Sequence, residues 1–173
     1  MATGTRSNKA PRNRIVFCVV VVLWFLFDRA TKFLVTEYPV DMLTSPRIEG
    51  VVEFSLVHNH GAAWGSFSGM VGALVVVTAI LCLIIAVYAF IASREASLLE
   101  IVGLALVFAG GIGNLVDRIV NGYVIDFIAP LFIDFPTFNI ADVGITCGIV
   151  CVIVALAIRF FASRGTTDER TMP

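Results

Sequence analysis

Long apolar runs alternate with shorter polar segments along this chain of 173 residues. A helix needs about 20 consecutive, mostly apolar residues to cross the hydrocarbon core of a bilayer. Four runs reach or nearly reach that length, at residues 15–35, 69–92, 98–116 and 141–161. The pattern therefore predicts an all-α membrane protein with four transmembrane helices.

Basic residues flank these runs unequally, and this predicts an orientation. Eight Lys and Arg residues lie before the first run, between the second and third, or at and beyond the end of the fourth, whereas four lie on the other side. Because cytoplasmic flanks carry the excess of Lys and Arg, both termini should be cytoplasmic. A cleaved signal peptide is the alternative for the first run, but no small-residue cleavage site follows it, so we expect a retained helix.

The outer segments are expected at about residues 37–68 and 117–139, and they are not uniformly polar. The sequence RIEGVVEFSLVHNHGAAWG has β-branched and aromatic residues bounded by glycines, which is typical of one or two short strands. The sequence GYVIDFI has the same character. We therefore expect a small extracytoplasmic β-like cradle, centred on the first outer loop.

Composition supports a membrane domain and excludes two other classes. The chain is 58% hydrophobic and only 14% charged, with a mean hydropathy of +0.94, which a soluble globule of this size does not need. The net charge of −1 offers no basic surface for nucleic acid. We expect one domain at residues 15–163, monomeric because four helices can surround one site, with disordered cytoplasmic ends at residues 1–14 and 164–173.

The cysteine and histidine residues do not predict a metal centre or another cofactor. The four cysteines lie within apolar runs, where they act as small hydrophobic residues rather than as a disulfide framework. Cys147 and Cys151 share a helix face, and His58 and His60 form an HxH sequence, but neither pair has an evident further ligand. The four cysteines are Cys18, Cys82, Cys147 and Cys151.

Polar residues from distant parts of the chain are expected in one layer at the outer ends of the helices. Charged side chains in or near a membrane are costly, so they usually mark function. The expected layer consists of Asp28, Lys32, Asn59, Asn114, Asp117, Arg118, Asp126, Asn139 and Asp142.

Structural roles alone would explain part of this layer. Asp28 and Lys32 are spaced i, i+4 and can form a local ion pair. Asp117 is expected to pair with a nearby cation rather than to take part in catalysis. The candidate cations are Arg29, Lys32 and Arg118.

Asp126 and Asp142 have the environments that acid–base chemistry requires. Asn139 and Asp142 have the spacing of a helix N-cap and an acidic N3 residue, and a cap alone would explain both. The helix macrodipole would also favour Asp142 as an anion, whereas the apolar sequence VIDFI should raise the pKa of Asp126. If the two meet in space, one can act as base on a water and the other as acid. Asp134, in LFIDFP, is expected to be a solvated turn residue.

The chain resembles the lipoprotein signal peptidases (signal peptidase II), which are membrane-embedded aspartic proteases of bacteria. The resemblance covers nearly the whole chain and rests on DRATK at 28–32, NHGAAWG at 59–65, GNLVDRIVNGYVIDF at 113–127 and FNIAD at 138–142. Gly61 and Ala63 match the small-residue motif of the outer loop. Trp64 stands where the family often has Phe, and His58 where an Arg is common, and these departures concern the shape of the substrate groove.

The resemblance implies that Asp126 and Asp142 are the catalytic pair and that no metal or other cofactor is needed. The implied substrate is a prolipoprotein carrying diacylglycerol on a cysteine, cut by an activated water just before that cysteine. The implied location is the bacterial cytoplasmic (inner) membrane, with the active site near the extracytoplasmic face. The substrate-binding or supporting residues would be Asp28, Lys32, Asn59, Gly61, Asn114, Arg118 and Asn139.

Two other functions remain open to the residues taken alone. A small ion- or proton-coupled transporter predicts carboxylates near the bilayer midplane, often with inverted repeats, but here they gather at one face and no internal repeat is found. A non-catalytic membrane scaffold predicts that Asp126 and Asp142 can become Asn without loss of function. Neither function explains why the sequences GNLVDR, VIDF and NIAD resemble those of the lipoprotein signal peptidases.

Overall fold

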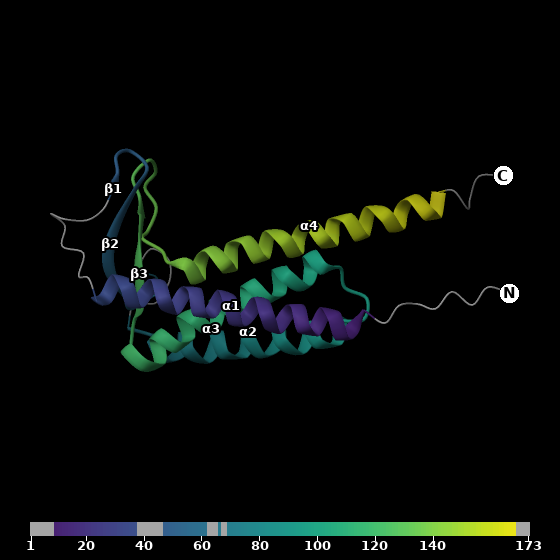
Figure 1. Cartoon of the computed structure of the whole chain (residues 1–173), viewed down its shortest axis with the longest axis horizontal. Helices are drawn as coiled ribbons and strands as arrows, with labels where there is room; N and C mark the ends of the chain where they lie inside the picture. The colour runs from purple at the N-terminus through teal and green to yellow at the C-terminus, as the bar shows by residue number, and fades with distance from the viewer. Residues whose placement is uncertain (1–8, 38–46, 62–65, 67–68, 169–173) are drawn as a thin grey trace.

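Four long helices and a small antiparallel sheet make up the computed structural model, which describes residues 9–37, 47–61, 66 and 69–168. The sheet lies at one end of the helices, and α1 begins and α4 ends at the other (Figure 1). The predicted mostly helical fold with a small β cradle is thereby confirmed. The elements are α1 (Ala10–Glu37), β1 (Arg47–Ile48), β2 (Val52–Asn59), α2 (Val71–Ala92), α3 (Leu98–Asn121), β3 (Val124–Pro130) and α4 (Ile140–Asp168).

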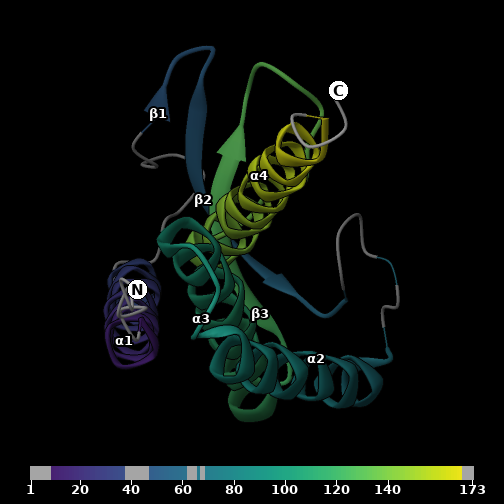
Figure 2. The same ribbon diagram turned by 90° about the vertical axis from the view of Figure 1, so that its right-hand side faces the viewer.

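Three of the described helices, α2, α3 and α4, are long and apolar enough to cross a membrane. Large apolar side chains stand exposed along α2 and α4, as at Ile84, Ile91 and Ile158, and exposed apolar surface of this extent is typical of contact with lipid. Helix α3 is largely buried and lies among the other three helices (Figure 2). The bundle is therefore built around α3.

Small residues let α3 and α4 approach closely, which is how many membrane helices associate. A Cβ added at Gly103 would lie 2.7 Å from the carbonyl oxygen of Gly148, and one at Gly148 would lie 2.6 Å from that of Gly103. Nearer the sheet, a Cβ at Gly110 would overlap the carbonyl group of Ala141. The first turn of α4 is therefore held directly against α3.

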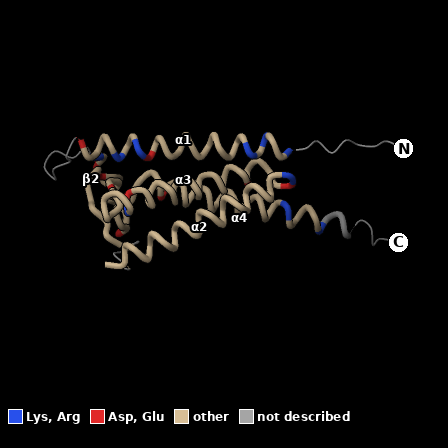
Figure 3. Tube along the Cα trace, turned by 90° about the horizontal axis from the view of Figure 1, so that it is seen from below, with Lys and Arg blue, Asp and Glu red and all other residues tan. Residues whose placement is uncertain are grey.

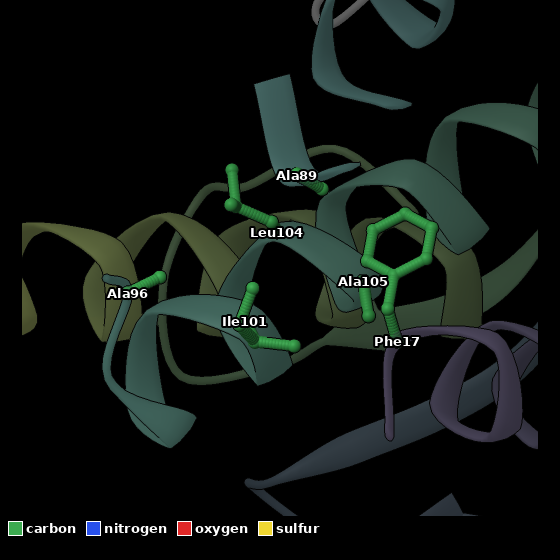
Figure 4. Packing of buried hydrophobic residues seen from close by; sticks show 6 residues of the cluster. All are labelled: Phe17, Ala89, Ala96, Ile101, Leu104 and Ala105. Carbon is green, nitrogen blue, oxygen red and sulfur yellow. The ribbon is translucent and has the colours of Figure 1, made fainter. Parts of the chain in front are cut away.

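A compact apolar cluster joins α1, α2 and α3 toward the end where α1 begins (Figure 4). The Phe17 ring lies 5.7 Å from that of Phe108 and 6.0 Å from that of Phe90, between centroids. Ile101 and Ala105 of α3 are fully buried beside them. This cluster fixes the spacing of three helices at the end farthest from the sheet.

The helices extend beyond the apolar runs that predicted them. Helix α1 begins at Ala10 rather than near residue 15, because the buried Asn13 side chain donates to the carbonyl oxygens of Ser93 and Ala96, at 2.9 and 3.1 Å. Helix α4 continues to Asp168, so residues 10–14 and 164–168 are helical where disorder was expected. The expected disorder of residues 1–8 and 169–173 lies outside the described residues.

Helix α3 also runs past the end predicted near residue 116. It ends at Asn121, and Gly122 caps it in the left-handed conformation (φ 78°), donating its N–H to the carbonyl of Arg118 at 3.2 Å. Asp117 and Arg118 therefore belong to the helix and not to the outer loop. The rigid helix, rather than a loop, sets the positions of both charges.

The sheet has the order β1-β2-β3, and both pairings are antiparallel. In the register of β2 with β3, Val57 pairs with Asp126 and Asn59 pairs with Val124, after an irregularity between Phe54 and Val57. Phe138 adds a short bridge to Ile128 on the other side of β3. The sheet thus brings Asn59 and Asp126 to the start of α4.

The close contact of α3 with α4 predicts that Gly110→Ala destabilises the protein by about 1–3 kcal/mol, as overpacking usually does. An exposed helical glycine would instead gain helix propensity on this change. Gly72→Ala is the matched control, because nothing lies within 4 Å of its added Cβ. Thermal unfolding in detergent measures both. A Gly110→Ala protein that unfolds at or above the wild-type temperature would contradict this packing.

Candidate active site

Four charged side chains from two helices form a closed ion network, and three of them are buried while Arg29 is partly exposed. Asp28, Lys32 and Asp117 are 0–2% exposed. Lys32 Nζ lies 3.1 Å from Asp28 Oδ1 and 2.7 Å from Asp117 Oδ2. Arg29 contacts the same two carboxylates, at 2.7 Å and 2.6 Å. The expected Asp28–Lys32 pair is present, and Asp117 pairs with Arg29 and Lys32 rather than with Arg118.

This network also holds the backbone of the elements beside it. Asp28 Oδ1 accepts the N–H of Ala141 at 3.0 Å, in the first turn of α4. Asp117 Oδ2 accepts the N–H of Ile125 at 3.3 Å, in β3. Trp24 adds a bond from its indole N–H to the carbonyl of Ile140 at 3.2 Å. The segments that carry Asp126 and Asp142 are therefore tied to α1 and α3.

Asn114 connects the ion network to Asp142. Its side-chain oxygen accepts from Lys32 Nζ and from the Asn139 amide, both at 3.0 Å. Its side-chain nitrogen donates to Asp142 Oδ1 at 2.7 Å. Both ends of the Asn114 amide are thus engaged, so its orientation is fixed by its neighbours.

Asn139 contacts both candidate carboxylates. It forms the predicted capping box with Asp142: its backbone N–H donates to Asp142 Oδ2 at 3.1 Å, and its side-chain oxygen accepts the Asp142 N–H at 3.0 Å. Its side-chain nitrogen also donates to Asp126 Oδ1 at 2.7 Å. Asn139 is fully buried, so one residue holds both carboxylates, Asp126 through its side-chain amide and Asp142 through its backbone N–H.

Asp126 lies in β3 and is buried, with 2% of the residue exposed. Besides Asn139, it accepts from the side-chain amide of Asn59 at 2.9 Å. The pKa of Asp126 is raised to about 6, mainly by burial and also by the charge of Asp142, against the opposing effects of the bonds from Asn59 and Asn139 and of the charge of Lys32. The expected upward shift is confirmed, and its main cause is loss of water.

A cavity of about 330 Å³ opens beside these carboxylates. Asp126 and Asp142 both line it, so the condition that the two meet at one site is satisfied. Its walls come from β2, β3, three helices and the segment before α4. The lining residues are Asn59, Thr78, Gly111, Asn114, Arg118, Val124, Asp126, Phe135, Pro136, Thr137, Phe138, Asp142, Ile145 and Thr146.

Arg118 lines the same cavity and holds the end of β2. One guanidinium nitrogen donates to the carbonyl of Gly61 at 2.9 Å, and another donates to that of Asn114 at 3.4 Å. Gly61 in turn donates its N–H to the Asn59 side chain at 2.9 Å. The Nε of Arg118 is buried with no hydrogen-bond partner among the described residues. It is a donor available to a ligand.

The structure separates other candidates from this site. Asp134 is exposed in the segment after β3, as expected for a solvated residue. His58 stacks on the Tyr123 ring with 4.1 Å between centroids, and His60 meets the edge of the same ring. Within the described ranges, no three His, Cys, Asp or Glu side chains are grouped to hold a metal ion. Ala63 and Trp64 lie outside the described residues.

Sequence reasoning missed two features. The first is two threonines of the cavity wall, Thr146, one helical turn beyond Asp142, and Thr78 of α2. Isolated threonines in apolar runs were the only available signal for them.

The second is at the end of the helices away from the sheet. The charges gather at the two ends of the helices (Figure 3), and the end away from the sheet has buried polar groups of its own. There the buried Glu100 accepts from the Tyr88 hydroxyl at 3.0 Å.

Comparison with known proteins identifies relatives over most of the chain. The family model described as signal peptidase (SPase) II matches residues 20–158. The lipoprotein signal peptidase of Staphylococcus aureus (strain JH9) is 37% identical over 143 residues, covering 80% of this chain and 85% of that protein, and the one of strain Newman matches equally well.

Two solved structures have the same fold. Both are described as bacterial membrane enzyme structures obtained by the in meso method. The one at 2.3 Å resolution has a TM-score of 0.73 at 29% identity and covers 91% of this chain and 93% of its own. The one at 1.9 Å has a TM-score of 0.70 at 32% identity, covering 81% and 91%. The chain therefore belongs to the signal peptidase II family, the lipoprotein signal peptidases, and is a protease.

Proposed function

We propose that Asp126 and Asp142 are the catalytic pair of an aspartic endopeptidase that removes the signal peptide from diacylglyceryl-modified prolipoproteins. The cut falls just before the lipidated cysteine. One observation carries the proposal: both carboxylates line one cavity and both are hydrogen-bonded by Asn139. Two carboxyl groups at one site, in unequal environments, are the arrangement that general acid–base hydrolysis needs.

The pair acts on a water bound in the cavity. With one proton shared between them, the ionised carboxylate removes a proton from the water as the water attacks the scissile carbonyl. The protonated partner donates its proton to the leaving amide nitrogen. Because the two groups are coupled, their apparent pKa values belong to the pair. The chain's own residues supply both roles, without a covalent acyl-enzyme intermediate.

The cavity is placed to receive a substrate anchored in lipid. Thr78 of α2 and Ile145 and Thr146 of α4 line it, and α2 and α4 both pack on α3. An acyl chain on the substrate cysteine can therefore remain in lipid between α2 and α4 while the peptide bond enters the cavity. The buried Nε of Arg118 is available to a substrate carbonyl.

The proposed enzyme spans the membrane four times, with α1 as a further span. The sequence from residue 15 to residue 27 is wholly apolar, and charges follow at Asp28, Arg29 and Lys32. The excess of Lys and Arg near the end where α1 begins and α4 ends supports cytoplasmic termini. The catalytic pair then lies near the extracytoplasmic face of the bacterial inner membrane, in a monomer that contains the whole site.

The proposal predicts that Asp126→Asn and Asp142→Asn each lower the cleavage rate by about a thousandfold or more, since each removes a catalytic acid or base. The measurement is cleavage of a diacylglyceryl-modified prolipoprotein by purified enzyme in detergent. Asp134→Asn is the matched control, because it removes an exposed carboxylate from the same outer segment, and it should cleave normally. Near-normal cleavage by either dyad variant, in a folded state, would overturn the assignment.

The raised pKa of Asp126 predicts the pH dependence of catalysis. The active pair holds one proton, so kcat/KM should fall as pH rises through about 6. Asn59→Ala removes a hydrogen bond that favours the ionised form of Asp126, so it should raise that pKa and move the fall in kcat/KM to higher pH. A pH profile that Asn59→Ala leaves in place, or moves to lower pH, would argue against Asp126 as the titrating group.

A further inference from the structure

A second cavity lies at the opposite end of the helices, away from the catalytic pair. It has a volume of about 370 Å³ and is lined by Arg14 of α1, Phe90 and Ile91 of α2, and Arg94 of the turn after α2. Two arginines beside two apolar side chains form an amphipathic groove. Its composition matches a ligand with an anionic head and an apolar body.

Arg14 is held at the edge of this groove by contacts that leave much of its guanidinium available. Its Nε donates to the Ser93 hydroxyl at 3.2 Å, and one Nη2 hydrogen points to the Phe90 carbonyl at 3.4 Å. Its Cζ lies 5.6 Å from the centroid of the Phe90 ring. A guanidinium has five N–H donors, so three have no partner among the described residues.

The charge of the groove is not neutralised by the protein. Arg94 is exposed and makes no side-chain hydrogen bond or ion pair with any other described residue. Neighbouring Glu95 forms no ion pair with Arg14 or Arg94 within the described ranges, and the Glu100 carboxylate is buried against Tyr88. Two cations therefore face the groove without a carboxylate partner.

The apolar side of the groove continues onto the lipid-facing surface of α2. Ile91 is 73% exposed and Val87 is 51% exposed, on a helix whose most apolar stretch has a mean hydropathy of 3.0. Ile15, which follows Arg14 in α1, is also exposed. Acyl chains lying against these residues would place a lipid phosphate beside the arginines, since basic pockets between membrane helices bind anionic headgroups.

We propose that this groove, formed by Arg14, Phe90, Ile91 and Arg94, binds the headgroup of an anionic phospholipid from the leaflet around the end where α1 begins. The phosphate contacts both guanidinium groups, and the acyl chains lie over Phe90 and Ile91. Binding there would hold α1 against the turn that joins α2 to α3. This site does not depend on the catalytic proposal.

The test uses native mass spectrometry of the full chain released from detergent, with phosphatidylglycerol and phosphatidylcholine of identical acyl chains as probes. The wild type should retain phosphatidylglycerol in preference to phosphatidylcholine. Each arginine near a lipid surface contributes about 1 kcal/mol, or roughly fivefold in affinity. Arg94→Gln should therefore weaken phosphatidylglycerol binding about fivefold, and Arg14→Gln with Arg94→Gln about thirtyfold.

The matched control is Arg12→Gln with Arg164→Gln, which removes the same charge from outside the groove. Arg164 also stacks on an aromatic ring, 4.5 Å from the Phe160 centroid, so it resembles Arg14 in its local contact. Retention of phosphatidylglycerol by this control supports the site. Equal loss in the control, unchanged binding in Arg94→Gln, equal retention of phosphatidylcholine, or displacement of the lipid by millimolar inorganic phosphate would each overturn it.

Discussion

The structure depends on the neutralisation of buried charge at the ends of α1 and α3 nearest the sheet. Two carboxylates, Asp28 and Asp117, are fully buried. Two cations, Lys32 and the partly exposed Arg29, each contact both carboxylates. An isolated charge at this depth would cost several kcal/mol, so all four must stay together. Helix α1 supplies Asp28, Arg29 and Lys32, and α3 supplies Asp117. The ion pairs therefore fix the position of α1 relative to α3. The same carboxylates accept backbone N–H groups from β3 and α4, so the network also constrains the segments that carry Asp126 and Asp142.

The carboxylates of the site fall into two groups, those paired with cations and those held by amides. Asp28 and Asp117 are paired with cations, whereas Asp126 receives hydrogen bonds from the amides of Asn59 and Asn139 and forms no ion pair with another described residue. A neutral donor fixes a carboxylate without fully compensating its charge, and so it leaves the group able to take up a proton near neutral pH. Asn139 matters most here, because it holds Asp126 and Asp142 at once. The proposed catalytic pair of this signal peptidase II is therefore positioned by amides that are themselves positioned by the ion network.

Much of this could be predicted from the sequence, because the relevant signals are local. The apolar runs predicted the helices, the i, i+4 spacing predicted the Asp28–Lys32 pair, and the sequence FNIAD predicted the capping box. The continuation of α3 to Asn121 could not be predicted, because a charge at Asp117 indicates the end of an apolar helix. In the structure Arg29 and Lys32 of α1 neutralise that charge, and this pairing depends on how the two helices pack. The contact of Asn139 with Asp126, and the threonines of the cavity wall, likewise depend on how distant segments pack. The four-span topology and the roles of individual site residues stay predictions.

The proposed division between structural and catalytic carboxylates can be tested most directly by the free energy of unfolding of Asp117→Asn and Asp126→Asn, measured side by side in the same detergent. Asp117→Asn removes one of the two carboxylates that Arg29 and Lys32 each contact, so the two cations share only Asp28. A loss of about 3–5 kcal/mol is typical of breaking a buried ion network in this way. Asp126→Asn removes a buried carboxylate that has no ion-pair partner among the described residues, and it disturbs only hydrogen bonds, each worth about 1–2 kcal/mol. The account therefore predicts that Asp117→Asn is clearly the less stable of the two. Equal stability, or a greater loss in Asp126→Asn, would contradict it.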